Sequence, residues 1–171
     1  MQTGETSYRI RLQGWFAPSW IVGLCAELAR CRLSIVSGHV LRKVDQTWVA
    51  ELEVDAEPEA VDPLTISYLD LTELVRDREV QPLCLIRYTV EETLAPGGAL
   101  HVTIEADDTL GLLGSMLAEL ALLLLFPVEL HIETRSGRAY DSFWLNAVGG
   151  AQPAPDVRTS LERALGRACA R

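Results

Sequence analysis

The two halves of this 171-residue chain align with each other, without a gap, at a shift of 92 residues. Residues 26–29 recur as residues 118–121, and both segments read Ala-Glu-Leu-Ala. Three further identities keep the same offset: Leu33 with Leu125, Val36 with Val128, and His39 with His131. Self-similarity at a fixed period indicates that one structural unit occurs twice. The repeat therefore predicts two small units of related structure.

The order of the predicted elements repeats as well. In the first half, hydrophobic patterns predict a strand at 8–13, a helix at 19–30, a hairpin from 34–41 and 47–54, a second helix opening at Asp62-Pro63, and a strand at 83–91. In the second half they predict a strand at 100–105, a helix at 110–124, a hairpin from 128–134 and 138–146, and a helix opening at Ala154-Pro155-Asp156. The last strand of the first half has no counterpart in the second.

Each predicted helix has an apolar stripe at helical spacing, which marks its inward face. In the first helix of each half the stripes are Ile21, Leu24, Cys25 and Leu28, and Leu113, Met116, Leu117 and Leu120. In the second helix they are Leu64, Tyr68, Leu71 and Val75, and Val157, Leu161, Ala164 and Ala168. The richest apolar run, 110–126, predicts that the first helix of the second half is buried on more than one side.

The order βαββα(β), found twice, is the ferredoxin-like unit, so the predicted fold class is α+β with antiparallel sheets and helices on one face. The first unit is expected at 1–92, a linker at 93–99, and the second unit at 100–171. The strand that the second unit lacks leaves an edge, and exposed edges require cover. The other unit, another segment of the chain or a second copy is expected to supply it.

Charge and cysteine content restrict the classes of partner and compartment. The net charge of −9 argues against nucleic-acid binding, because phosphate-binding proteins concentrate positive charge on one face. The four cysteines have neither disulfide-framework nor zinc-ligand spacing, and the polar first residues do not resemble a secretion signal. We therefore expect reduced thiols and a cytoplasmic protein with no metal site and no cofactor.

The stretch 109–128 contains a single charged residue, Glu119, and raises the question of a membrane span. The flanks argue against a span, because they are acidic and offer no Lys or Arg to fix its topology. Interspersed glycines and Pro127 also interrupt the apolar run. The alternation that follows from 128 is typical of a half-buried strand. The sequence therefore predicts a buried helix followed by a strand, and no membrane partner.

Two segments of the second half resemble a known family. Ala106-Asp107-Asp108-Thr109-Leu110-Gly111-Leu112-Leu113 resembles the Asp-x-Pro-Gly-Leu-Leu start of the ACT regulatory domain, with Leu110 in place of proline. Residues 138–150 resemble the third strand of the ACT domains of bacterial PII uridylyltransferases and ACT-repeat proteins. The first half matches by layout alone, because Phe16 and Ser19 replace the acidic residue and the glycine. The layout is similar to that of stand-alone two-ACT regulators, such as the repressor-like protein of the glycine cleavage system.

The resemblance implies a noncatalytic, allosteric regulator that binds an amino acid or similar metabolite between units, forms a homodimer and signals to a protein partner. It implies a ligand site formed by Asp107, Asp108, Thr109, Leu110, Gly111, Leu112 and Leu113, with Trp15, Phe16 and Ser19 as weaker candidates. A helix N-terminus suits a ligand carboxylate, and Asp108 suits an ammonium group. Two alternatives stay open: Asp108 caps the helix, or the protein is a ligand-free interaction module.

Other residues have both a functional and an ordinary interpretation. His39 and His131 coincide in the repeat and suggest a shared ligand or pH-sensing role, or two solvent-facing side chains. The acidic run 51–62 lacks the glycine-centred loop of a cation site. The sequence contains no nucleophile elbow and no phosphate-binding loop, so an enzyme on this scaffold is the less economical interpretation.

Overall fold

The structure is a computed structural model that describes residues 6–68, 82–94 and 99–170. Its elements follow in the order β1 (Thr6–Gly14), α1 (Trp20–Arg30), β2 (Leu33–Arg42), β3 (Trp48–Ala56), the 3₁₀ turn η1 (Pro63–Thr65), β4 (Arg87–Glu92), β5 (Leu100–Asp107), α2 (Leu112–Leu122), β6 (Leu125–Arg135), β7 (Arg138–Ala147), the 3₁₀ turn η3 (Val148–Gly150) and α3 (Pro155–Cys169). The fold is α+β, as predicted, and every strand pairing is antiparallel.

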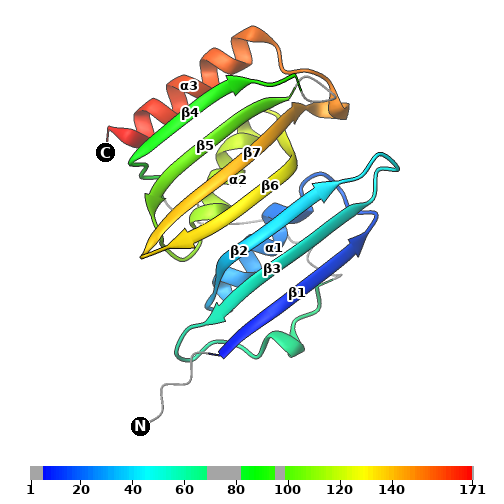
Figure 1. Ribbon diagram of the computed structural model, residues 1–171, viewed down its shortest axis with the longest axis vertical. Helices are drawn as coiled ribbons and strands as arrows, with labels where there is room; N and C mark the ends of the chain where they lie inside the picture. Colours follow the sequence, from blue (N-terminus) through cyan, green and yellow to red (C-terminus); the bar gives the residue numbers. More distant parts are fainter. Residues whose placement is uncertain (1–5, 69–81, 95–98, 171) are drawn as a thin grey trace.

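The seven strands form one continuous sheet in the order β1-β3-β2-β6-β7-β5-β4, with the helices on one face (Figure 1). The halves meet where β2 pairs with β6. In this ladder His39 lies opposite His131, and the pair Gly38–Ile132 mirrors the pair Val40–Leu130. The two halves are therefore related locally by a twofold axis between the histidines. The axis superposes residues 92 apart, which is the offset of the sequence repeat.

The strand predicted at 83–91 forms as β4, but its position differs from the expectation. It pairs with β5 from Arg87 opposite Glu105 to Glu92 opposite Leu100, and not with the first half. The short connection that follows favours this arrangement, since Thr93 donates its backbone N–H to the Ala99 carbonyl at 3.2 Å and closes a hairpin. β4 thus occupies the edge at which the second half lacks a strand. The division of the chain at residues 92–93 stays a prediction.

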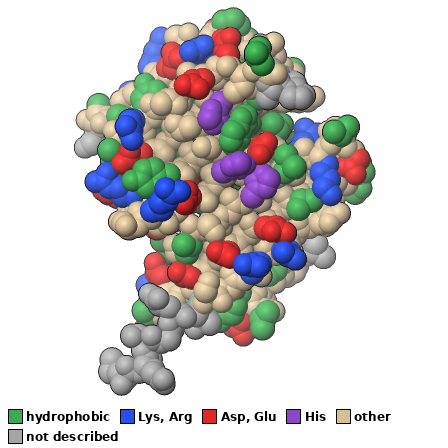
Figure 2. Space-filling model, viewed as in Figure 1, with side chains coloured by type: hydrophobic (Ala, Val, Ile, Leu, Met, Phe, Trp, Pro, Cys, Tyr) green, Lys and Arg blue, Asp and Glu red, His purple; other side chains and the backbone are tan. Residues whose placement is uncertain are grey.

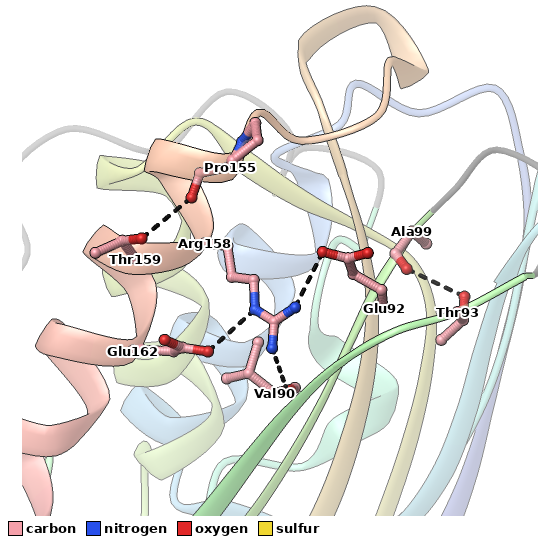
Figure 3. A network of polar contacts seen from close by, with 8 residues as sticks. All are labelled: Val90, Glu92, Thr93, Ala99, Pro155, Arg158, Thr159 and Glu162. Carbon is pink, nitrogen blue, oxygen red and sulfur yellow. Dashed lines mark hydrogen bonds and ion pairs between the residues drawn. The ribbon is translucent and has the colours of Figure 1, made fainter.

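Polar contacts with α3 hold β4 in this place (Figure 3). Arg158 contacts Glu92 at 3.0 Å, donates to the Val90 carbonyl at 3.4 Å and contacts Glu162 at 3.0 Å. The Tyr88 hydroxyl donates to the Glu162 carbonyl at 3.2 Å. Strand and helix are therefore joined by side chains of both, and the edge strand belongs structurally to the second half.

The second helix predicted for the first half is present only as its first turn in the described residues. Asp62 caps η1 by accepting a hydrogen bond from the Leu64 backbone N–H at 3.0 Å. Leu64 was expected to point inward, but its side chain is 85% exposed because the turn does not continue as a helix at this point. Tyr68 is half-buried, and its hydroxyl donates to the Pro63 carbonyl. Leu71 and Val75 lie outside the described residues.

The core lies between the sheet and the helices, and the predicted inward faces of α1 and α2 are buried as expected. The expected burial of the second half's first helix on more than one side is confirmed for α2, in which residues 112–121 are all buried or half-buried. The end of the apolar run differs, since Leu122 and Leu124 are 78% and 61% exposed. None of the helices in the described residues has the length and apolarity needed to cross a membrane.

Candidate functional site

The loop predicted to bind a ligand connects the end of β5 to the start of α2. Gly111 occupies the position before the helix with φ +89°, a left-handed conformation that favours glycine. The Asp108 backbone N–H donates to the Gly137 carbonyl at 2.9 Å, which ties the loop to the β6–β7 turn. The left-handed turn at Gly111 and the anchor at the neighbouring β6–β7 turn thus define the position of the loop.

Six of the seven predicted residues, Asp108 to Leu113, line a cleft on the helix side of the sheet, while Asp107 is exposed outside it. The opposite wall comes from the first half: Cys25 and Ala29 of α1, and Leu33, Ser34 and Ile35 of β2. The two helices are adjacent here, and a Cβ on Gly114 would lie at an ordinary contact distance of 3.7 Å from the Cβ of Cys25. The cleft is therefore a seam between the two halves.

The cleft encloses about 30 Å³. This volume holds a buried water molecule, whereas a drug-sized ligand occupies a pocket roughly ten or more times larger. In the described conformation the seam therefore admits a water or an ammonium-sized group. An amino acid requires α1 to move away from the start of α2.

Asp141 lies in the floor of the cleft and was not among the predicted site residues. It is on β7, on the face of the strand that points toward the helices, and is 3% exposed. Burial raises the pKa of Asp141 to about 7; a backbone hydrogen bond from Glu133 opposes the shift and the nearby charge of Asp108 adds to it. That backbone N–H lies 3.4 Å from Oδ1. Asp141 is therefore an acidic group poised to change its charge near neutral pH.

Asp108 is the second carboxyl group of the cleft. Burial raises its pKa, and a hydrogen bond with the Thr134 side chain opposes the rise. The alternative in which Asp108 caps α2 is wrong: the capping position belongs to Gly111, which makes no side-chain cap, and Asp108 instead bonds to β6. Two carboxyl groups therefore lie beside the N-terminus of α2: Asp108 is half-buried and Asp141 is almost fully buried.

The weaker candidates of the first half lie outside this cleft. Trp15 is 73% exposed, and Phe16 packs its ring against Trp20 with centroids 4.8 Å apart. Ser19 occupies the cap position of α1 without a side-chain cap hydrogen bond. The first half contributes its α1 and β2 residues to the cleft in their place.

Sequence reasoning missed Asp141 although the signal was present. Along β7 the inward positions alternate as Ala139, Asp141, Phe143 and Leu145, and all four are buried. A carboxylate in an otherwise apolar register is costly unless it has a partner or a function. The residues from α1 could not be found in this way, because only the packing of the halves brings them to the loop.

Comparison with known proteins returned no matching family model and no matching curated protein. Among solved structures, one of a candidate glycine cleavage system transcriptional repressor is similar at 15% sequence identity. The match covers 97% of this chain and 93% of that chain, with a TM-score of 0.34. The description of the fold therefore rests on the strand order and pairing given above.

Proposed function

We propose that this protein is a noncatalytic regulator that binds an amino acid, or a similar small metabolite with an amine, at the seam between its halves. The observation that carries the proposal is the pair Asp108 and Asp141, desolvated together beside the start of α2. A buried carboxyl pair of this kind attracts a cation. The N-terminus of a helix attracts an anion. The two features together match the two charges of an amino acid.

Binding of an ammonium group gives a proton signature. Near pH 7 Asp141 holds a proton in part of the molecules, because its pKa is about 7. A bound cation favours the ionised carboxylate and lowers that pKa, so Asp141 releases its proton on binding. The apparent binding enthalpy then depends on the ionisation enthalpy of the buffer, which calorimetry in two buffers measures.

The small volume of the seam links ligand binding to a rearrangement of the two halves. A ligand larger than a water molecule has to part α1 from the start of α2, since their walls enclose only about 30 Å³. Its binding therefore favours a second arrangement of the two halves, and differential affinity for two arrangements is what couples a ligand to a partner. The protein partner and the homodimer expected from sequence remain parts of this proposal.

The test is a calorimetric and thermal-shift screen against the twenty amino acids, followed by variants. Asp108→Asn and Asp141→Asn are expected to weaken a binder by about 10-fold or more each, since each removes a desolvated charge partner. Asp107→Asn is the matched control, because it removes the same charge from an exposed neighbour. Absence of heat and of thermal stabilisation with every amino acid contradicts sensing of this ligand class.

The alternative is a ligand-free interaction module. The small volume of the seam, about 30 Å³, favours this alternative. Among the described residues β1 pairs only with β3, so one side of this edge strand is available to a second copy. The alternative predicts a dimer by light scattering together with a silent amino-acid screen. A monomer in solution that binds an amino acid contradicts it.

A further inference from the structure

The face of the sheet that is not covered by helices carries a second cluster of potential ligand side chains. In Figure 2 this face is toward the viewer, and the histidine side chains gather over the middle of the sheet. His39 and His131 lie directly opposite each other in the β2–β6 ladder. Glu129 is two residues before His131 on β6, so both side chains project from the same face. This cluster lies on the opposite face of the sheet from the seam cleft.

The three side chains converge on one point. The Nε2 atom of His131 lies 2.8 Å from Oε1 of Glu129, and the Nε2 atom of His39 lies 3.2 Å from the same oxygen. Their three ligand atoms all lie within 4.8 Å of one another. The two imidazole rings stand nearly perpendicular, at 89°, with centroids 4.6 Å apart. Two ring nitrogens and one carboxylate oxygen therefore face a common volume.

From this geometry we propose that His39, His131 and Glu129 bind one divalent transition-metal ion, with Zn²⁺ as the best match. Imidazole nitrogen and carboxylate oxygen are ligands that Zn²⁺ accepts, and two His with one Glu leave a position open for water. Tetrahedral ligands at about 2.1 Å from the ion are about 3.3 Å apart. The ring nitrogens thus need to approach by about 1.5 Å or less, and the side chains of His39 and His131, 50% and 53% exposed, have that freedom.

The surroundings of the cluster support the assignment. His131 packs against Trp144 with centroids 4.9 Å apart, and Trp144 in turn stacks on His101 at 4.4 Å, which restricts the ring on one side. An open groove of about 670 Å³ leads to both ligand histidines. Glu51, Glu53 and Glu133 line this groove as well, but each is paired with an arginine, so the groove adds no excess negative charge and the assignment rests on the three converging ligands.

The site joins the two halves of the chain, because one histidine comes from each copy of the repeat. Sequence spacing does not reveal it, since the ligands are 90 or 92 residues apart and meet only when β2 pairs with β6. A bound ion fixes the distance between these two strands. This proposal does not depend on the ligand proposed for the seam.

The test is zinc titration of the chelator-treated full chain against a chromogenic zinc indicator, with thermal unfolding in parallel. We expect one Zn²⁺ per chain and a higher Tm. His39→Gln and His131→Gln are expected to lower the affinity by more than about 100-fold, which exceeds the effect of losing an outer-sphere partner. His101→Gln removes the third histidine of the same face, which contacts the cluster only through Trp144, and is expected to keep one Zn²⁺ per chain with a smaller loss of affinity than either ligand variant.

A second variant distinguishes zinc binding by the cluster from zinc binding by the exposed thiols. Cys84 and Cys169 are exposed and could hold zinc themselves, so Cys84→Ser/Cys169→Ser is expected to retain full binding. The proposal is overturned by loss of binding in that thiol variant, by equal affinities of all histidine variants, or by a chain that takes up no zinc. Half an equivalent of zinc with conversion to a dimer also overturns it, because the ion would then bridge two chains.

Discussion

Asp141→Asn is expected to make the protein more stable at alkaline pH and to leave its stability unchanged at acid pH. Asp141 is buried, and its pKa rises from 3.8 in the unfolded chain to about 7 in the folded one. Between these values the unfolded chain has lost the proton while the folded chain retains it. Folding stability contributed by the neutral acid is therefore fully present below about pH 4 and is lost as the pH rises toward 7.

The size of the effect follows from the shift. A change of about 3 pKa units corresponds to about 4 kcal/mol, which is a large part of the stability of an ordinary domain. Asparagine has nearly the same shape as the protonated acid, and it can accept the same hydrogen bond from the Glu133 backbone. The free energy of unfolding of Asp141→Asn minus that of the wild type should grow from about 1 kcal/mol at pH 4.5 to about 4 kcal/mol at pH 8.

The assay is urea unfolding of both proteins at half-unit pH intervals from 4.5 to 8.5. Asp45→Asn is the control: hydrogen bonds from Thr47 lower the pKa of Asp45, so this group is ionised throughout the range and its variant should shift the curve without changing its slope. All groups other than the substituted one are the same in the three proteins, so their contributions cancel in the differences. Curves of wild type and Asp141→Asn that run parallel from pH 4.5 to 8.5 refute the reasoning.

Three further substitutions test the packing of β2, the end of α2 and the edge strand. Gly38→Ala should destabilise the chain by about 1–3 kcal/mol in urea unfolding, because the new Cβ would lie 2.4 Å from Cδ2 of Leu52; an unchanged midpoint contradicts this packing. Leu124→Asn should stabilise it by about 1 kcal/mol, since residue 124 is exposed with φ +56°, and a loss of stability argues against backbone strain there. Arg158→Ala should lower the urea midpoint, by less at high salt, whereas Arg163→Ala on the exposed side of α3 should leave it unchanged; equal effects contradict the network of Figure 3.

Local patterns predicted the elements and their inward faces well. The 3.6-residue spacing of Ile21, Leu24 and Leu28 places them on one face of α1, and all three are buried. The alternation along β6 and β7 is equally local. The 92-residue offset predicted the coincidence of His39 with His131, and the fold turns that coincidence into a cross-strand pair.

The features that sequence could not supply depend on partners far along the chain. The pattern of 83–91 identifies a strand but not its neighbour, and the hairpin through Thr93 and Ala99 decides for β5. One wall of the candidate cleft was predicted, because residues 108–113 form one continuous loop. The rest of the lining was not, since Ala29 reaches the loop only through the packing of α1 on α2, and the strand pattern around Asp141 does not show that it faces the loop.

The two proposed sites lie on opposite faces of the same β2–β6 ladder. This placement predicts whether binding at one site strengthens or weakens binding at the other. A ligand in the seam parts the helices on one face, which bends the sheet about the ladder and brings side chains on the other face together. Zinc is favoured by the same movement, because bending would bring the ring nitrogens of His39 and His131 closer to the separation that the ion requires. Each ligand should therefore tighten binding of the other by an equal factor. Amino-acid affinity measured with and without zinc, with His131→Gln as the control, checks this, and a weaker affinity in zinc contradicts the bending.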